Sequence, residues 1–194
     1  MRYLPNLITA ARIALTPVLL ALLMTETLWS QAAALGLFML VAASDYVDGV
    51  VARSYGASSR IGKFLDPLAD KVLVLSLLIA LAILEPATVP WWAVLIIALR
   101  DVAVTGLRTW SKSHGRNVPT LRLSKLKTAL QLFFLFLMLL LIVSTKVGGT
   151  VEQSGRWMLH SYIPYLLLLT LVGITVYTGW QYFYPREQPA RRKR

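Results

Sequence analysis

Long apolar segments alternate with short polar ones along almost the whole of this 194-residue chain. Each apolar segment is about 20 residues long, which is the length that an α-helix needs to cross the hydrocarbon core of a bilayer. The pattern therefore predicts an all-α, polytopic membrane protein with six transmembrane helices. The predicted spans are residues 7–23, 31–52, 61–84, 91–110, 127–144 and a segment within 157–184. They form one domain over residues 1–184, and a basic tail follows over residues 185–194.

The amino-acid composition supports a membrane protein. Hydrophobic residues make up 57% of the chain and charged residues only 15%, whereas soluble domains have about 45–50% and about 25%. A net charge of +11 would indicate nucleic-acid binding in a soluble protein, but here the basic residues lie mainly between the apolar segments. At those positions they orient the protein and contact anionic lipid headgroups. We therefore expect membrane lipids as partners and no nucleic acid.

Basic residues are distributed unequally between the two sides of the predicted bundle. An even number of spans places both termini on one side. The connections and tail of that side contain Arg53, Arg60, Lys63, Lys112, Arg116, Arg122, Lys125 and the final Arg-Arg-Lys-Arg. The connections of the other side contain only Lys146 and Arg156 as basic residues. Because cytoplasmic loops carry the excess of Lys and Arg, we expect both termini in the cytoplasm.

Four aspartates stand close together in residues 44–71, in a chain with only nine acidic residues. Asp45 and Asp48 are spaced i, i+3, and Asp66 and Asp70 are spaced i, i+4, so each pair shares one face of its helix. The connection between the two predicted helices is short. We therefore expect the helices to be antiparallel neighbours and the four carboxylates to converge on one site near the cytoplasmic surface.

This convergence predicts a metal site. Four carboxylates near hydrocarbon are costly unless a positive charge neutralises them. The chain has no cysteine, and oxygen-only ligands favour a hard cation, Mg²⁺ first, with Mn²⁺ or Ca²⁺ as alternatives. Carboxylates that hold two ions about 3.5–4 Å apart suit phosphoryl transfer, because the ions stabilise the entering and the leaving oxygens.

Three small residues and one arginine near this stretch each have two interpretations. Gly49 and Ala52 lie near the face of Asp45 and Asp48, and Gly62 lies one turn before Asp66. They either let a ligand approach the backbone or only allow close helix packing. Arg12 lies one to two turns inside the first span, where it either snorkels to the interface or faces the polar interior near the aspartates.

The complete pattern is D-x2-D-G-x2-A-R-x8-G-x3-D-x3-D, from Asp45 to Asp70. At every fixed position it matches the signature of the CDP-alcohol phosphatidyltransferase family, which the chain resembles over most of its length. The resemblance implies an integral membrane enzyme of the bacterial inner membrane, and a homodimer. Such an enzyme transfers a phosphatidyl group from a CDP-linked lipid to an alcohol and releases CMP.

The resemblance also implies roles for individual residues. Asp45, Asp48 and Asp66 match the metal-binding acids, and Asp70 completes the metal set and is the expected general base, with two Mg²⁺ ions as cofactor. The residues that correspond to the CDP-binding region are Asn6, Thr9, Asp48, Gly49, Ala52, Arg53 and Gly62. This assignment agrees with the chemistry, since metal ions neutralise a pyrophosphate and a base takes the proton of the attacking hydroxyl.

Basic residues at the same end indicate an acceptor that carries a phosphate. Arg100 and Arg108 lie i, i+8 on one helix, and an arginine inside a span indicates an anionic partner. Alternatively, Asp101 only neutralises one of these arginines, and the loop lysines only mark the cytoplasmic side. The expected acceptor-phosphate site consists of Arg100, Arg108, Lys125, Lys127 and Thr128.

Three segments resemble the members of the family that use sn-glycerol 3-phosphate. They are PNLITAARIALTP, GKFLDPLADK and LSKLKTALQ. The implied substrates are CDP-diacylglycerol and glycerol 3-phosphate, and the implied products are phosphatidylglycerol phosphate and CMP. Two alternatives remain at this point. The same chemistry could use inositol phosphate, serine or phosphatidylglycerol, or the acids could line the path of a divalent-cation transporter.

Overall fold

The computed structural model describes the backbone of residues 4–55, 62–113 and 122–183, and the side chains of residues 11–44, 71–107, 123 and 126–181. Seven α-helices and no strand occur in this part of the chain. The helices are α1 (Leu4–Met24), α2 (Leu28–Tyr55), α3 (Gly62–Leu84), α4 (Trp91–Ser113), α5 (Arg122–Ser144), α6 (Gly149–Leu159) and α7 (Tyr162–Phe183). The prediction of an all-α protein is therefore confirmed.

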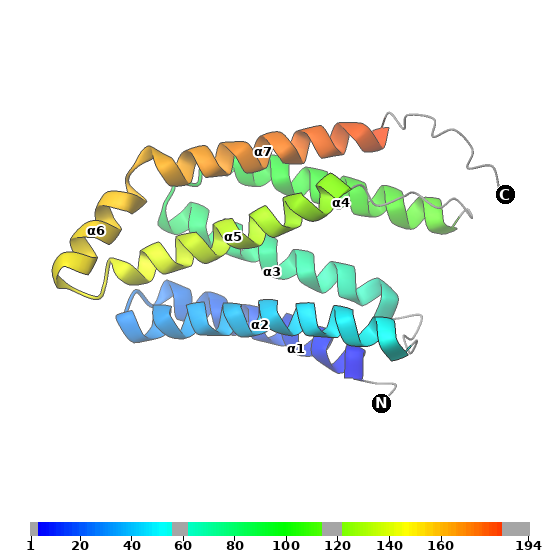
Figure 1. The fold of residues 1–194 in the computed structure, drawn as a ribbon, viewed down its shortest axis with the longest axis horizontal. Helices are drawn as coiled ribbons and strands as arrows, with labels where there is room; N and C mark the ends of the chain where they lie inside the picture. Colours follow the sequence, from blue (N-terminus) through cyan, green and yellow to red (C-terminus); the bar gives the residue numbers. More distant parts are fainter. Residues whose placement is uncertain (1–3, 56–61, 114–121, 184–194) are drawn as a thin grey trace.

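Six long helices form an elongated bundle, and the short α6 crosses one end of it (Figure 1). The central helix is α5, which packs on α2, α3, α6 and α7, while α4 packs on α3 and α7. The end of α2, the start of α3, the end of α4 and the start of α5 lie at the same end of the bundle (Figure 1). We call this end the site end, because it contains the residues that the sequence singles out.

Helix α6 is an element that the sequence does not predict. Residues 145–156 are predicted as a polar connection with a turn at Gly148-Gly149. Both glycines have positive φ values, 92° and 63°, so the turn is confirmed, but a helix begins directly after it. The inward face of α6 is short, and its buried residues are Gly155 and Leu159. A Cβ on Gly155 would lie 3.0 Å from Cβ of Ser144, so this glycine lets α6 fold back onto the end of α5.

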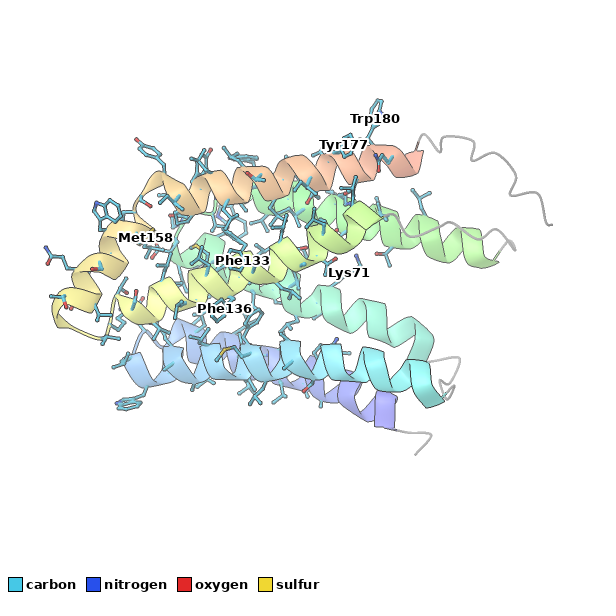
Figure 2. All side chains as sticks on the ribbon, in the orientation of Figure 1. Lys71, Phe133, Phe136, Met158, Tyr177 and Trp180 are labelled. Carbon is cyan, nitrogen blue, oxygen red and sulfur yellow. The ribbon has the colours of Figure 1, made fainter. Side chains whose placement is uncertain are left out.

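The core is a single apolar cluster. Most of its buried residues come from the six long helices, and α6 contributes its last residue, Leu159. Its largest fully buried side chains include Leu19, Leu77, Ile97, Phe134 and Leu171. The outer surface is also apolar, because Leu40, Leu99, Phe133 and Trp180 are among many large hydrophobic side chains that are more than half exposed. Tyr177 and Trp180 point away from the bundle on α7 (Figure 2). A surface of this kind fits contact with lipid rather than with water.

Two segments of the described residues are long and apolar enough to cross a membrane, Leu126–Ser144 and Tyr162–Gln181. Shorter apolar helical segments are Ala11–Met24, Leu28–Ser44 and Lys71–Leu84. Together with the apolar outer surface, these segments support association with a membrane. The six predicted spans correspond to α1–α5 and α7, whose bounds lie within a few residues of the prediction, apart from the sixth, which begins at Tyr162.

A polar cavity of about 250 Å³ lies at the end of the bundle opposite the site end. Its lining includes Glu26, Gln31, Glu85, Lys146 and His160. Burial raises the pKa of the Glu85 carboxyl above its usual range, and the positive charge of His160 opposes that shift. None of the residues that the sequence predicts for the site is among the residues that line this cavity.

Candidate active site

The backbone brings the two aspartate pairs to the site end. Asp45 and Asp48 lie in the second half of α2, and Asp66 and Asp70 lie in the first turns of α3. The two helices run in opposite directions, as predicted (Figure 1). The prediction that they are neighbours is not met over the described residues, where both pack on α1 and not on each other. The local spacing could not reveal this third helix, because it comes from an earlier part of the chain.

The side chains of the four aspartates lie outside the described residues, as do those of the predicted CDP-binding residues. The latter are Asn6, Thr9, Gly49, Ala52, Arg53 and Gly62. Among the side chains that the structure describes, no group of three or more acids or histidines could hold a metal ion. The predicted donor set fits a hard cation, because it consists of carboxylates only and the helix ends that carry it lie at the same end of the bundle. The convergence of these carboxylates stays a prediction.

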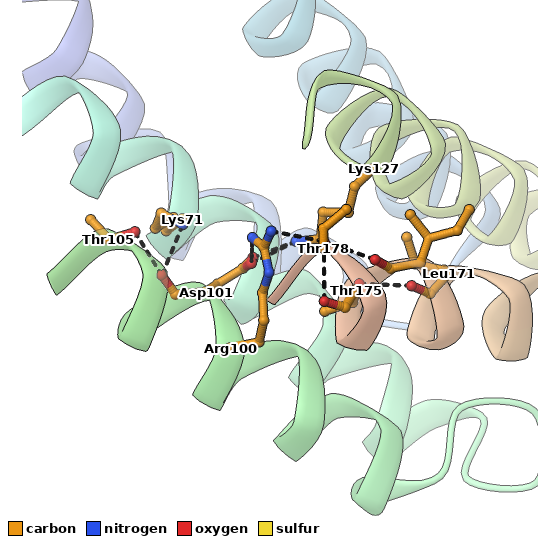
Figure 3. Close-up of polar contacts among 9 residues, drawn as sticks. Lys71, Arg100, Asp101, Thr105, Lys127, Leu171, Thr175 and Thr178 are labelled. Atoms are coloured by element: carbon orange, nitrogen blue, oxygen red, sulfur yellow. Dashed lines mark hydrogen bonds and ion pairs between the residues drawn. The ribbon is translucent and has the colours of Figure 1, made fainter. Parts of the chain in front are cut away.

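The described part of the site is centred on Asp101 of α4, which is buried with 4% of its surface exposed (Figure 3). Nζ of Lys127, on α5, donates to both carboxylate oxygens of Asp101, at 2.7 and 2.6 Å. Nη1 of Arg100 donates to Oδ1 at 3.0 Å. Both carboxylate oxygens of Asp101 are therefore hydrogen-bonded to cations, which is the condition for a buried charge to be tolerated.

Two further helices join this centre through Lys71 and Thr178. Nζ of Lys71, on α3, donates to the main-chain oxygen of Asp101 at 3.1 Å, and the Thr105 hydroxyl donates to the same oxygen at 2.6 Å. Nη2 of Arg100 donates to the Thr178 hydroxyl oxygen, on α7, at 2.8 Å. We call Lys71, Arg100, Asp101, Lys127 and Thr178 the Asp101 cluster. It connects α3, α4, α5 and α7 at one point (Figure 3).

The Asp101 cluster has an excess of positive charge. It contains three cationic side chains and one carboxylate, so its formal charge is +2. The side chains of Arg100 and Lys127 are 10% and 3% exposed, which places this charge in a largely dry environment. Electrostatic attraction between opposite charges is much stronger there than in water. The guanidinium fork and the compact ammonium are the two groups that proteins use to hold phosphate.

The structure brings together part of the predicted acceptor site. Arg100 and Lys127 meet at Asp101, so Asp101 does pair with Arg100, and Lys127 joins the pair. Binding of an acceptor phosphate by these cations stays a prediction. Thr128, the next residue of α5, is exposed, whereas Lys127 is buried. The side chains of Arg108 and Lys125 lie outside the described residues.

Sequence reasoning misses Lys71 and Thr178. Lys71 enters the sequence pattern only as the last residue of the aspartate stretch, although a lysine at the start of an apolar helix segment is itself a signal. Thr178 and Thr175 are fully buried polar residues one turn apart in the apolar helix α7, which is a weaker signal. Neither signal identifies its partner, since Thr178 is 78 residues from Arg100.

Arg12 of α1 is buried, with 3% of its surface exposed. The Thr16 hydroxyl, one turn further along, donates to the main-chain oxygen of Arg12 at 2.8 Å. A snorkelling arginine would place its guanidinium at the outer surface. The burial of Arg12 therefore contradicts the snorkelling interpretation, while its proximity to the aspartates stays a prediction.

The chain belongs to the CDP-alcohol phosphatidyltransferase family, because the model of that family matches residues 2–177.

Bacterial relatives of known name are similar over most of the chain. A CDP-diacylglycerol–glycerol-3-phosphate 3-phosphatidyltransferase of Bacillus subtilis (strain 168) is 36% identical over 194 aligned positions, which cover 93% of each chain. A protein of the same name from Rickettsia typhi is 34% identical over 94% of this chain and 96% of its own length. Another from Escherichia coli (strain K12) is 35% identical over 66% of this chain and 71% of its own.

Proposed function

We propose that this protein transfers the phosphatidyl group of CDP-diacylglycerol to sn-glycerol 3-phosphate, giving phosphatidylglycerol phosphate and CMP. The observation that carries this proposal is the Asp101 cluster. It gathers the cations of α4 and α5 next to the part of α3 that carries Asp70, because Lys71, the residue after Asp70, donates to the main-chain oxygen of Asp101. The names of the relatives in Bacillus subtilis and Rickettsia typhi describe the same reaction.

The proposed chemistry is an attack of the acceptor hydroxyl on the phosphorus that bears the diacylglycerol. The bond from this phosphorus to the CMP oxygen breaks, and Asp70 takes the proton of the attacking hydroxyl. Asp45, Asp48, Asp66 and Asp70 would hold two Mg²⁺ ions, which neutralise the pyrophosphate and stabilise the leaving CMP when bound. The CDP moiety would lie against the residues near these acids. They are Asn6, Thr9, Asp48, Gly49, Ala52, Arg53 and Gly62.

The cations of the Asp101 cluster favour an acceptor that carries a phosphate monoester. The phosphate of glycerol 3-phosphate is such a group and carries close to two negative charges at neutral pH. Arg100 and Lys127 would bind it directly, with Arg108, Lys125 and Thr128 as further ligands. Serine has no phosphate, and the phosphate of phosphatidylglycerol is a diester with one negative charge, so both fit the cluster less well.

In the proposed membrane arrangement, α1–α5 and α7 are the six spans and α6 lies outside the membrane on the far side. Both termini and the site end face the cytoplasm, as the distribution of Lys and Arg predicts. The membrane is the bacterial inner membrane, and the enzyme is a homodimer. CDP-diacylglycerol would then reach the site from the bilayer, and glycerol 3-phosphate would reach it from the cytoplasm.

Measuring CMP release tests the acceptor. The detergent-solubilised protein is given CDP-diacylglycerol and Mg²⁺, with glycerol 3-phosphate, inositol phosphate, serine or phosphatidylglycerol as acceptor. We expect CMP release to depend on glycerol 3-phosphate. Release with serine or phosphatidylglycerol should be at least about tenfold lower, because a site built for a charged group rejects analogues that lack it. Inositol phosphate carries the same phosphate group, so the comparison with it tests the size of the acceptor rather than its charge. CMP release that does not depend on glycerol 3-phosphate would overturn the proposed function.

Gly179 of α7 offers a test of the role of Arg100. A Cβ at Gly179 would lie 3.1 Å from Cγ of Arg100, so alanine would push the arginine stem away from its present position. We expect G179A to raise the KM for glycerol 3-phosphate about threefold to tenfold and to leave the KM for CDP-diacylglycerol unchanged, since a shift of this size weakens a charged hydrogen bond without removing it. Steady-state kinetics measures both constants.

The matched control for this test is Gly173→Ala on the same helix, where an added Cβ meets no atom within 4 Å. It changes helix propensity in the same way but touches nothing. Equal effects of the two substitutions on the KM for glycerol 3-phosphate would show that contact with Arg100 is not the cause.

A further inference from the structure

Within the proposed function, the negative charge of Asp101 needs an explanation. A carboxylate at the centre of a site for a phosphate repels the ligand, and replacing Asp101 with a neutral residue would raise the formal charge of the cluster from +2 to +3. Its placement is nevertheless fully specified, because Lys127 and Arg100 hydrogen-bond both of its oxygens and 4% of its surface is exposed. Asp101 therefore needs a role other than direct contact with the acceptor.

The side chain of Asp101 holds two cations that come from different places. Lys127 extends from α5, 26 residues further along the chain, and Arg100 precedes Asp101 on α4. Lysine and arginine side chains have many rotamers, and ordering each of them costs free energy. With the carboxylate present, this ordering takes place during folding, so an incoming phosphate meets cations that are already in position. Thr178 completes this arrangement by accepting a hydrogen bond from the other arm of Arg100.

The main chain of Asp101 connects the same point to the helix that carries the predicted base. The main-chain oxygen of Asp101 accepts a hydrogen bond from Nζ of Lys71, and Lys71 directly follows Asp70 in α3. The side chain of Lys71 is partly buried, and Figure 3 shows it reaching across from α3 to α4. One residue thus fixes the cations through its carboxylate and fixes the position of α3 relative to α4 through its carbonyl.

We infer that Asp101 is a positioning residue that sets the position of the acceptor-phosphate site relative to the reacting end of α3. This inference rests on the proposed function. In glycerol 3-phosphate, three carbons separate the reactive hydroxyl from the phosphate, so the distance between the two groups is limited. If the cations or α3 shift, the phosphate is bound but its hydroxyl no longer lies against the base and the lipid phosphorus. Misplacement by about 1 Å can cost about 100-fold in rate.

Loss of the contacts of the Asp101 carboxylate and loss of the contact of its main-chain carbonyl should have different kinetic effects. D101N keeps the size of the side chain but releases Lys127 and Arg100, so we expect the KM for glycerol 3-phosphate to rise at least about tenfold. Inorganic phosphate competes with glycerol 3-phosphate, and it should inhibit this variant at least about tenfold more weakly than the wild type.

Lys71→Met releases α3 from the carbonyl, so we expect kcat to fall about 10- to 100-fold, with a smaller change in the KM for glycerol 3-phosphate. In both variants the KM for CDP-diacylglycerol should stay within about twofold of wild type.

Matched controls come from the opposite end of the bundle. Lys146→Met and Glu152→Gln make the same kinds of change in two exposed ion pairs, Lys146 with Glu26 at 3.6 Å and Glu152 with Arg156 at 2.9 Å. Both should leave the kinetics unchanged, because exposed pairs contribute little. Lys71→Arg keeps the positive charge and the donor and should recover at least part of the kcat that Lys71→Met loses.

The outcomes separate the inference from the proposed function. If the wild type shows no dependence on glycerol 3-phosphate, the proposed function fails. If the wild type shows that dependence but D101N binds glycerol 3-phosphate and inorganic phosphate as well as the wild type or more tightly, Asp101 does not position the cations and the inference is overturned. If D101N does not fold, as judged by thermal unfolding in detergent, Lys71→Met decides the question alone. In that variant, an unchanged kcat overturns the inference.

Discussion

Replacing Lys127 with methionine is expected to lower kcat/KM for glycerol 3-phosphate by about two to three orders of magnitude. The ammonium group donates to both carboxylate oxygens of Asp101 at 2.7 and 2.6 Å, and 2% of the residue is exposed. In the proposed function the ammonium group also pairs with the acceptor phosphate, and removing one partner of such a buried, hydrogen-bonded charge pair costs about 2–5 kcal/mol of binding free energy, with a factor of ten for each 1.4 kcal/mol. Methionine keeps the length of the apolar stem, so the loss reports on the charge. Steady-state kinetics with varied glycerol 3-phosphate measures it.

Lys146→Met is the control for K127M, because it makes the same change at a partly exposed lysine at the other end of the bundle. We expect its kcat/KM to match the wild type. A K127M variant that keeps wild-type kcat/KM for glycerol 3-phosphate while it folds normally would show that the Asp101 cluster is a structural ion-pair network. The acceptor site would then have to be sought among the other basic residues of the site end, Arg108 and Lys125.

Replacing Asp70 with asparagine is expected to abolish most of the turnover while the protein keeps its affinity for CDP-diacylglycerol. A positioned general base contributes about 10²- to 10⁴-fold, and asparagine has nearly the same shape but cannot accept the proton. Metal binding should be largely kept, because three further aspartates belong to the predicted donor set. The rate of CMP release measures turnover, and CDP-diacylglycerol binding in the presence of Mg²⁺ measures the affinity.

Glu152→Gln on α6 is the control for D70N, since it removes one carboxylate charge far from the site end. If D70N retained turnover, Asp70 would not be the base. If D70N lost metal and CDP-diacylglycerol binding together with turnover, the loss of a metal ligand would explain the result. No role of Asp70 in proton transfer would then be needed. A cation transporter, the remaining alternative from the sequence, would release no CMP from CDP-diacylglycerol, whether as the wild type or as the D70N variant.

The features that the sequence determined by itself are local or averaged over long segments. The bounds of α1–α5 lie within a few residues of the predicted spans, because hydrophobicity summed over about 20 residues is a strong signal. The spacing of Asp45, Asp48, Asp66 and Asp70 defines helix faces without knowledge of the partners. The complete pattern from Asp45 to Asp70 resembles the signature of the family that the match over residues 2–177 confirms. Helix α6 was not predicted, because its inward face, with Gly155 and Leu159 buried, is too short to form a periodic pattern.

The Asp101 cluster was decided by the tertiary structure alone. Arg100 and Lys127 were predicted to act together, but their meeting at Asp101 depends on how α4 and α5 are placed by α3 and α7, on which both pack, and the apolar surfaces of these helices leave this open. Lys71 and Thr178 enter from α3 and α7, 30 and 78 residues away in sequence from the groups that they contact. Such contacts form only when four helices have found one packing arrangement, because a helix fixes the direction of its own side chains but not the identity of its neighbours. The sequence therefore determined which charges the site end contains, and the packing of the helices determined which of them share one carboxylate.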